Sequence, residues 1–251
     1  MGIIIESIIK VKDLRKVYKL GKEKVIALDN INIEIKKGEI CCILGVSGSG
    51  KSTLLNMLAG LEKPTRGDII INECKVNRLS EKKLAIFRQK YIGFVFQSYN
   101  LIPTLTALEN VAMPLIFKRV WKNKRMKMAK QMLKLVGLND RLRHKPTQMS
   151  GGQQQRVGIA RAFVSKPAVV FADEPTGNLD SKTTIEVMNL MVKMARENNL
   201  TLVIVTHDRD IAEYSDRIIQ LKDGSVTDDY IVEHNEINEI KNTEDLGEIS
   251  V

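Results

Sequence analysis

The stretch EICCILGVSGSGKSTLLNMLAGL, residues 39–61, decides the fold of this chain. It runs from a compact apolar segment through a glycine-rich turn into leucines at helical spacing, which predicts a strand, a turn and a helix. The turn fits G-x-x-x-x-G-K-[ST], in which glycines let backbone N–H groups surround phosphates at a helix N-terminus. We therefore expect a nucleoside triphosphate to contact the turn and first helical residues: Gly45, Ser47, Gly48, Ser49, Gly50, Lys51, Ser52 and Thr53.

Within this turn, we expect Lys51 to hold the β- and γ-phosphates and the Ser52 hydroxyl to ligate Mg²⁺. A second apolar run, VVFADE at residues 169–174, ends in two acids. Asp173 is placed to hold the metal, and Glu174 to act as the general base that polarises the attacking water. Without the phosphate loop, the same pair would be interpreted as solvated acids at a strand end.

A third apolar run, LTLVIVTHD at residues 200–208, follows the helical pattern TTIEVMNLMVKMAREN. Strand, helix and strand with buried strands indicate a parallel sheet. Ligands of such sheets sit at the carboxyl ends of the strands, so His207 and Glu174 should lie on the same side as the phosphate loop. We expect His207 to contact the γ-phosphate; the alternative is an ordinary surface histidine.

The rest of the chain surrounds this α/β core. Residues 3–35 alternate apolar and polar side chains, which predicts strands of an antiparallel sheet. The pattern from about 86 to 165 is mostly helical and basic, and predicts an inserted helical subdomain. The predicted fold is a RecA-like P-loop core with an N-terminal antiparallel β subdomain, over residues 3–226, followed by an acidic tail at 227–251.

Composition limits the classes of protein that remain. The 251 residues are 43% hydrophobic, without an apolar run long enough for a membrane span, and the N-terminus lacks a basic leader with a cleavage site. We therefore expect a cytoplasmic protein. Three cysteines without metal-ligand spacing argue against a disulfide framework or a zinc site. The net charge of +9 suits nucleic acid, an anionic membrane surface or nucleotides, and does not choose among them.

Together, the ordered motifs resemble the nucleotide-binding subunit of an ATP-binding cassette (ABC) transporter, over roughly residues 7–226. The motifs are the phosphate loop, FVFQSYN, MSGGQ, VVFADE, GNLD and THD. Met149 replaces the family's usual leucine with a side chain of similar volume. The segments IGFVFQSYNLIPTLTALENVAMPL and ADEPTGNLDSKT are similar to the branch of lipoprotein-release, macrolide-export, cell-division and antimicrobial-peptide-resistance cassettes.

The resemblance implies an ATPase that uses ATP and Mg²⁺ and forms a homodimer on binding ATP. Two such cassettes face each other head to tail, and one segment of each chain covers the ATP held by the phosphate loop of the other. That segment is Ser150, Gly151, Gly152 and Gln153. Ser150 is also a good helix N-cap, and both roles hold together because a capped helix N-terminus suits phosphate.

Other roles follow from the resemblance one residue at a time. Tyr18 is similar to the aromatic that stacks on adenine, with an ordinary edge-strand tyrosine as the alternative. Gln97 is similar to the glutamine that touches Mg²⁺ and senses a transmembrane permease, and Asp180 to the aspartate that links the two sites of the dimer. The resemblance implies a subunit that powers export, extraction or mechanotransmission from the inner face of the cell membrane.

Rival functions share only some of these features. A P-loop kinase or GTPase would lack MSGGQ and the THD strand end. A soluble ABC ATPase acting on nucleic acid or ribosomes remains the alternative, although such proteins usually insert a long coiled coil or carry two cassettes; we expect no nucleic acid as partner. A scaffold that only binds ATP would be expected to have lost Glu174 or His207.

Two charged segments stand apart from these motifs. Residues 118–134 contain eight Lys or Arg and no acid, whereas residues 226–251 contain eight acids and one Lys. The basic run predicts either a face near anionic lipid or permease loops, or a solvated helical face on which Trp121 buries one side of its ring. The acidic tail is expected to fold back on this face or to remain free, and deleting residues 227–251 would test its effect on docking.

Overall fold

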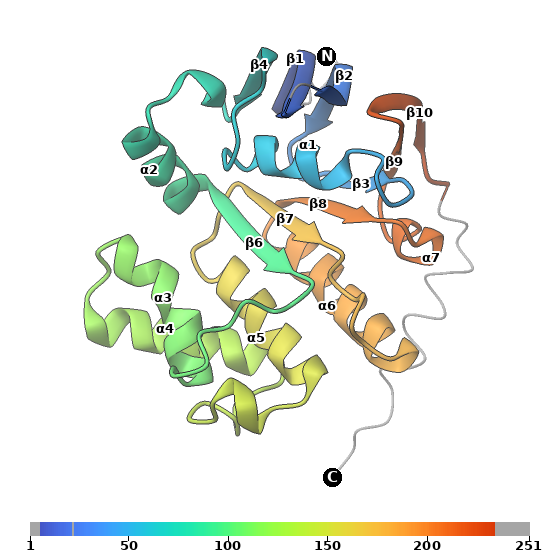
Figure 1. The fold of residues 1–251 in the computed structure, drawn as a ribbon. Helices are drawn as coiled ribbons and strands as arrows, with labels where there is room; N and C mark the ends of the chain where they lie inside the picture. Colours follow the sequence, from blue (N-terminus) through green and yellow to red (C-terminus); the bar gives the residue numbers. More distant parts are fainter. Residues whose placement is uncertain (1–5, 22, 234–251) are drawn as a thin grey trace, which may run out of the picture.

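The computed structural model describes residues 6–21 and 23–233, which form two sheets with helices on both sides of the larger one (Figure 1). A four-stranded antiparallel sheet has the order β2-β1-β4-β5, and a six-stranded sheet has the order β10-β9-β3-β8-β7-β6. Strands β3, β6, β7, β8 and β9 run parallel. The predicted α/β core with an N-terminal antiparallel subdomain is confirmed.

Two strands open the described chain, and strands and helices are interspersed after them. The strands are β1 (Ser7–Leu20), β2 (Glu23–Lys36), β3 (Ile40–Leu44), β4 (Arg66–Ile71), β5 (Cys74–Lys75), β6 (Ile92–Phe96), β7 (Val169–Asp173), β8 (Thr201–Thr206), β9 (Arg217–Lys222) and β10 (Ser225–Ile231). The α-helices are α1 (Lys51–Leu58), α2 (Glu81–Tyr91), α3 (Ala107–Phe117), α4 (Lys122–Leu135), α5 (Gly151–Phe163), α6 (Ser181–Glu197) and α7 (Arg209–Ala212). Short 3₁₀ turns cover Val76–Arg78 and Pro146–Gln148.

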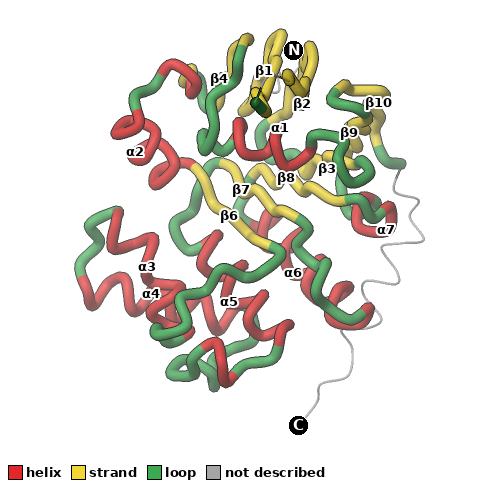
Figure 2. Tube along the Cα trace, in the orientation of Figure 1, coloured by secondary structure: helices red, strands yellow, loops and turns green. Residues whose placement is uncertain are grey.

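The six-stranded sheet separates two large hydrophobic cores. Successive side chains of a strand point to opposite faces, so Phe171 packs with α1 and the antiparallel sheet, whereas Val170 and Ala172 pack with α5 and α6. Figure 2 shows α3, α4 and α5 gathered on the side of β6 away from the antiparallel sheet. The phosphate-loop helix α1 and the helix α5 after MSGGQ therefore belong to different layers.

Two boundaries differ from those predicted. The segment expected as a helical insertion, residues 86–165, contains β6, which pairs in parallel with β7. The segment expected as an acidic tail begins inside β10, which continues to Ile231 and pairs with β9. The two successive acids of this edge strand look like tail composition because nearly every residue of the strand is exposed. Residues 234–251, the rest of the predicted tail, lie outside the described residues.

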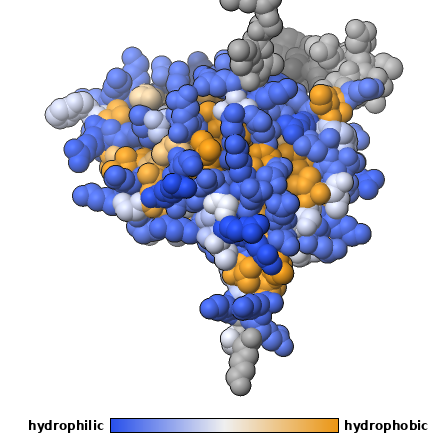
Figure 3. Space-filling view, turned by 90° about the horizontal axis from the view of Figure 1, so that it is seen from above, coloured by the Kyte–Doolittle hydropathy of each residue, from blue (hydrophilic) through white to orange (hydrophobic). Residues whose placement is uncertain are grey.

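Trp121 also differs from the expectation that its ring would be half buried. Its side chain is 86% exposed, at the turn where α4 begins. None of the helices formed by the described residues is both long and apolar enough to cross a membrane. Seen from above, the surface is mostly hydrophilic, with apolar groups in separate patches (Figure 3).

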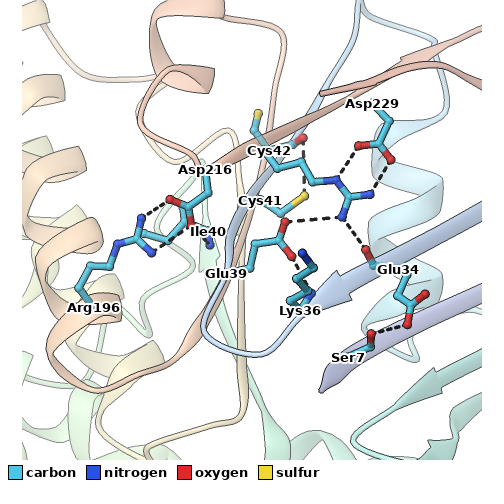
Figure 4. Close-up of polar contacts among 11 residues, drawn as sticks. Ser7, Glu34, Lys36, Glu39, Ile40, Cys41, Cys42, Arg196, Asp216 and Asp229 are labelled. Carbon is cyan, nitrogen blue, oxygen red and sulfur yellow. Dashed lines mark hydrogen bonds and ion pairs between the residues drawn. The ribbon is translucent and has the colours of Figure 1, made fainter. Parts of the chain in front are cut away.

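A network of charged groups closes the edge of the large sheet where β3 begins (Figure 4). The Arg217 guanidinium makes two hydrogen bonds to the Asp229 carboxylate, at 2.5 and 2.6 Å, and donates a third to the Glu34 carbonyl at 2.7 Å. Asp216 accepts from the Ile40 N–H at 2.9 Å and pairs with Arg196. The network joins the antiparallel sheet, β3, the β9–β10 hairpin and α6.

Candidate functional site

The opposite edge of the large sheet, where the parallel strands end, gathers most of the predicted site. Register places Leu44 beside Thr206, Val205 beside Asp173, and Asp173 beside Phe96. The phosphate loop follows Leu44, Glu174 follows Asp173, His207 follows Thr206, and Gln97 follows Phe96. Four segments that are distant in sequence thus reach one edge because their strands are parallel and aligned.

The phosphate loop turns tightly against the start of α1. Gly50 has φ 99°, a left-handed conformation that favours glycine, and the Lys51 amine donates to the carbonyls of Gly45 and Val46 at 2.6 and 2.9 Å. A Cβ atom on Gly45 would lie 2.3 Å from the Leu221 carbonyl oxygen and 2.6 Å from Ser49 Oγ. The loop therefore exists only with glycine at its entrance.

The N–H groups at the start of α1 have no side-chain cap, since Gly50 occupies the N-cap position. Ser49 Oγ is buried without a hydrogen-bond partner among the described residues. Exposed Ser47 and Ser52 stand on either side of the loop. Unsatisfied donors and a positive helix terminus are what a phosphate chain can satisfy.

Two neighbouring carboxyl groups, those of Asp173 and Glu174, lie at the end of β7. Burial raises the pKa of Asp173; the negative charge of Glu174 raises it further, and Lys51 opposes both. Glu174 has φ 43°, an uncommon conformation for a residue with a side chain, and its N–H donates to the Val205 carbonyl at 2.9 Å. The strand end is thus held in a strained geometry that directs two acids to the same place.

Both oxygens of the Glu174 carboxylate are oriented by β8. Thr206 Oγ1 donates to Oε2 at 2.9 Å, and His207 Nδ1 lies 2.8 Å from Oε1. A fixed carboxylate beside a phosphate loop can accept a proton from water. Sequence reasoning placed Glu174 and His207 on one side of the sheet but missed Thr206, whose position directly before His207 at a strand end was the available signal.

Gln97 and the segment after Glu174 lie against each other. The Asn178 amide donates to the Gln97 carbonyl at 3.1 Å. A Cβ on Gly177 would lie 2.6 Å from Gln97 Nε2, so the glutamine side chain packs directly against the glycine backbone. Among the described residues, no three His, Cys, Asp or Glu side chains form a ready metal cluster. One carboxylate, one hydroxyl and one amide fit Mg²⁺, which usually takes few protein ligands beside phosphates and water.

The MSGGQ segment does not approach the phosphate loop of its own chain. Ser150 caps α5 in a reciprocal capping box: its Oγ accepts from the Gln153 N–H at 3.3 Å, and the Gln153 side chain accepts from the Ser150 N–H at 3.1 Å. Helix α5 packs in the opposite layer from α1, below the strands in Figure 1. The N-termini of α1 and α5 could each bind a phosphate group. Because they lie in different layers, they cannot bind the same ligand within one chain.

The start of α5 is nevertheless close to other predicted site segments. A Cβ on Gly152 would lie 2.5 Å from Thr183 Cγ2, and one on Gly151 would lie 2.7 Å from the Tyr99 hydroxyl. Asp180 caps α6 by accepting from the N–H and hydroxyl of Thr183 at 2.9 and 2.7 Å, hydrogen bonds that lower the pKa of Asp180. Gln97, Ser150 and Asp180 thus belong to three segments in mutual contact.

Arg161 is a residue that sequence reasoning missed. It is mostly buried in α5, and its guanidinium donates to the carbonyls of Tyr99 and Asn100, the latter at 2.5 Å. Both carbonyls belong to left-handed residues just after Gln97. Arg161 therefore fixes the Gln97 segment to the helix that begins at Ser150, a link between elements 61 or more residues apart.

Tyr18 lies beside the phosphate-loop helix. Its hydroxyl donates to the Glu62 carboxylate at 2.6 Å, and the Lys16 amine sits 4.9 Å from the ring centre. Burial raises the pKa of Tyr18, with a further contribution from Glu62, while a hydrogen bond with Thr53 lowers it. A half-buried ring next to Thr53 is within reach of a base whose phosphates occupy the loop.

Comparisons with known proteins point to one family. The family described as "ABC transporter" matches residues 28–177. An ABC transporter ATP-binding protein of Methanocaldococcus jannaschii, MJ0796, is 51% identical over 222 residues, covering 87% of this chain and 94% of the relative. The lipoprotein-releasing system ATP-binding protein LolD of Acinetobacter baylyi is 44% identical over 218 residues, covering 86% and 96%.

A longer relative and a solved structure extend the comparison. The macrolide export ATP-binding/permease protein MacB of Vibrio parahaemolyticus is 45% identical over 234 residues, which are 93% of this chain and 36% of MacB. A dimeric structure of the cassette MJ0796 bound to ADP and Pi, described as a post-hydrolysis state, superposes with a TM-score of 0.83 at 48% identity, covering 90% of this chain and 100% of that one.

Proposed function

The chain belongs to the ABC transporter family, and on this premise we propose that it is the ATP-binding and ATP-hydrolysing subunit that powers a transmembrane partner. The observation that carries the proposal is the single edge at which the phosphate loop, Asp173, Glu174 and His207 meet. This edge has a phosphate-binding loop, an oriented base and a metal-type carboxylate, which are the parts needed for phosphoryl transfer to water.

Each residue at this edge then has one task. The loop N–H groups and Lys51 bind the β- and γ-phosphates, and Tyr18 stacks on the adenine. Glu174, held by Thr206 and His207, accepts the proton of the attacking water, and His207 also contacts the γ-phosphate. Ser52, Gln97 and Asp173 hold Mg²⁺, which when bound neutralises phosphate charge. The rate comes from positioning and electrostatic stabilisation of the transferred group.

The second helix start completes the site of another copy. Ser150 to Gln153 carry a capped, positive helix terminus on the layer away from their own phosphate loop. We place them on the ATP of a second copy, arranged head to tail, with Asp180 next to both sites. Binding of ATP closes this homodimer, and hydrolysis loosens it. The dimeric form of MJ0796 is a precedent among relatives.

The transmembrane partner has a groove to occupy. A hollow of about 620 Å³ lies between α2, β6, α3 and α5, lined largely by apolar side chains including Ile86, Phe94 and Phe117. Ile86 and Phe117 are 56% and 63% exposed. Arg161 lines the same hollow and holds the Gln97 segment, so a partner in the groove touches the residue that positions Gln97. The chain is then peripheral on the inner face of the membrane.

ATP hydrolysis by the purified chain tests the catalytic proposal. Glu174→Gln should bind ATP as tightly as the wild type and lose about 10²- to 10⁴-fold in kcat, since it removes the base without changing side-chain size. Glu213→Gln, the same change on an exposed residue at the end of α7, is the matched control and should keep the wild-type rate. Equal rates for both variants would remove Glu174 as the base.

A further inference from the structure

The segment from Asn110 to Asn139 carries only positive charge. It contains eight Lys or Arg and no acid. Lys118 is turned inward, donating to the Ser165 carbonyl at 2.7 Å, and burial, with the nearby charge of Lys90, lowers the pKa of its amine. Most of the remaining cations are exposed and lie at the start of α4 and along it: Arg119, Lys122, Lys124, Lys127, Lys130 and Lys134.

These cations form a continuous stripe on α4. Lys124, Lys127, Lys130 and Lys134 follow one another at spacings of three or four residues, which makes neighbours on a helix surface. Ala129 and Leu133, both fully buried, fix the opposite face of α4 against the core. Among the described residues, no Asp or Glu forms an ion pair with the stripe. Within the part of the chain that the structure describes, the stripe is therefore a positive surface without a paired acid.

Trp121 stands at the head of the stripe, three residues before Lys124. It is the only tryptophan of the chain and is 86% exposed. Ile116 and Phe117, at the end of α3, are 48% and 63% exposed on the same turn. In Figure 1, α3 and α4 lie side by side at the rim of the molecule, on the side that carries α2. A surface that combines an exposed aromatic ring with a row of lysines has both an apolar and a cationic part.

We propose that this α3–α4 surface, made of Trp121 with Arg119, Lys122, Lys124, Lys127, Lys130 and Lys134, binds the anionic headgroups of a lipid bilayer. Charge complementarity favours anionic lipid, since each exposed Lys or Arg near such a surface gains about fivefold in affinity. Trp121 favours a bilayer over a purely polar polyanion because tryptophan rings settle at the boundary between headgroups and acyl chains.

The location of the surface supports the same partner. Phe117 lines the groove that we assign to the transmembrane partner, and Trp121 follows four residues later. The proposal rests in this respect on the proposed function, since a groove occupied by a permease faces the membrane. Contact with lipid would attach the chain to the membrane at a second point, beside its contact with the permease. It would also fix the orientation of α3, α4 and α5 relative to the membrane.

Fluorescence of Trp121 tests the proposal on the full chain without nucleotide or permease. The probe is a set of vesicles, either phosphatidylcholine alone or phosphatidylcholine mixed with phosphatidylglycerol. With anionic vesicles, the emission of Trp121 should shift to shorter wavelength and the protein should co-sediment with the vesicles. Added salt should reverse both effects because it screens the attraction. Because no ATP is turned over, failure here is distinguishable from failure of the catalytic proposal.

Matched variants test whether this surface, and not the overall positive charge of the chain, binds the vesicles. Lys124→Gln with Lys127→Gln should weaken vesicle binding by about 30-fold, whereas the same changes at exposed Lys12 and Lys37, on and after the antiparallel strands, should leave it unchanged. Trp121→Phe should retain most of the sedimentation and Trp121→Ser should lose much of it. Unchanged emission with anionic vesicles, or equal effects of the two lysine pairs, would overturn the proposal, and full vesicle binding by Trp121→Ser would overturn the part that it assigns to Trp121.

Discussion

The two edges of the six-stranded sheet are built from the same strands and have opposite characters. At the edge where β3 begins, each charged group has a partner: Arg217 binds Asp229 and Asp216 binds Arg196. At the edge where the parallel strands end, Asp173 is half buried beside another acid, Glu174 is left-handed, and Ser49 Oγ has no partner among the described residues.

The difference separates stability from function within one sheet. Partners of opposite charge raise the pKa of Arg217, so its charge stabilises the fold. Burial and a like charge raise the pKa of Asp173, so its charge costs free energy in the free protein. Groups left without partners in this way are available to a ligand. Substitutions at the two edges should therefore have opposite consequences for activity and stability.

After Glu174→Gln, the largest effect is expected from Lys51→Ala. It removes the amine that faces the phosphates, and loss of one such donor lowers kcat by about 10²- to 10³-fold. The thermal midpoint should change little, because the cost of burying the Lys51 charge offsets the two hydrogen bonds that its amine donates to carbonyls of its own loop. ATP turnover and thermal unfolding of the same sample measure both. A large fall in the midpoint would mean that Lys51 is a structural residue.

The next largest effect is expected from Gly45→Ala. The new Cβ would meet the Leu221 backbone oxygen at 2.3 Å, which a side-chain movement cannot relieve, so unfolding should become easier by about 3 kcal/mol and ATP binding should weaken. Gly158→Ala is the control: its Cβ would have only ordinary contacts at 3.7 Å, and alanine gains about 0.5–1 kcal/mol in a helix. Similar effects of the two substitutions in urea unfolding would contradict this account.

Asp229→Asn should lower stability and leave ATP turnover unchanged, the opposite of what we expect for Lys51→Ala. It weakens the two charged hydrogen bonds to Arg217 at the paired edge, with an expected loss of about 1–2 kcal/mol in stability. The thermal midpoint should fall by about 2–8 °C for a chain of this size. ATP turnover per folded molecule should be unchanged, and reduced turnover at temperatures well below the midpoint would show that the edges are not independent.

The smallest effect on stability is expected from Asp173→Asn, which should stabilise the free protein by about 0.5–1 kcal/mol. The same substitution should impair ATP hydrolysis. Because the pKa of Asp173 is raised in the fold, the native state binds its proton more tightly than the unfolded chain. The resulting penalty develops as pH rises through the raised pKa and is complete at neutral pH. The gain should thus be largest at neutral pH and absent below the ordinary Asp range. A variant less stable than wild type at pH 7 would contradict it.

The sequence predicted the functional edge better than the paired edge. Phosphate loop, Asp173, Glu174 and His207 each follow a short apolar run, so local pattern and the geometry of parallel strands were enough to bring them together. Arg217 meets the Glu34 carbonyl across 183 residues, and such a contact depends on sheet order and register, which local pattern does not contain. Arg161 was missed for the same reason, since its partners are carbonyls, which no side-chain motif reveals.

Composition was the weakest guide at the C-terminal segment. Asp228 and Asp229 were counted with an acidic tail, yet both lie in β10, where Asp229 pairs with Arg217. An edge strand whose residues are nearly all exposed has the composition of a tail, and only the pairing partner distinguishes the two. The roles assigned to the site residues all stay predictions, since they concern ligands and a second copy: those of the phosphate loop with Lys51 and Ser52, of Asp173, Glu174 and His207, and of Tyr18, Gln97, Asp180 and Ser150 to Gln153.

The molar mass of the Glu174→Gln variant in solution, with and without ATP and Mg²⁺, shows whether two copies share their ATP sites. We expect a monomer of 28.3 kDa without nucleotide and a dimer with it, and a monomer under both conditions once Ser150→Arg is added, because the new side chain blocks the start of α5. A monomer with ATP bound, or an ATP-dependent dimer that persists with Ser150→Arg, would contradict the claim that α5 of one copy completes the site of the other.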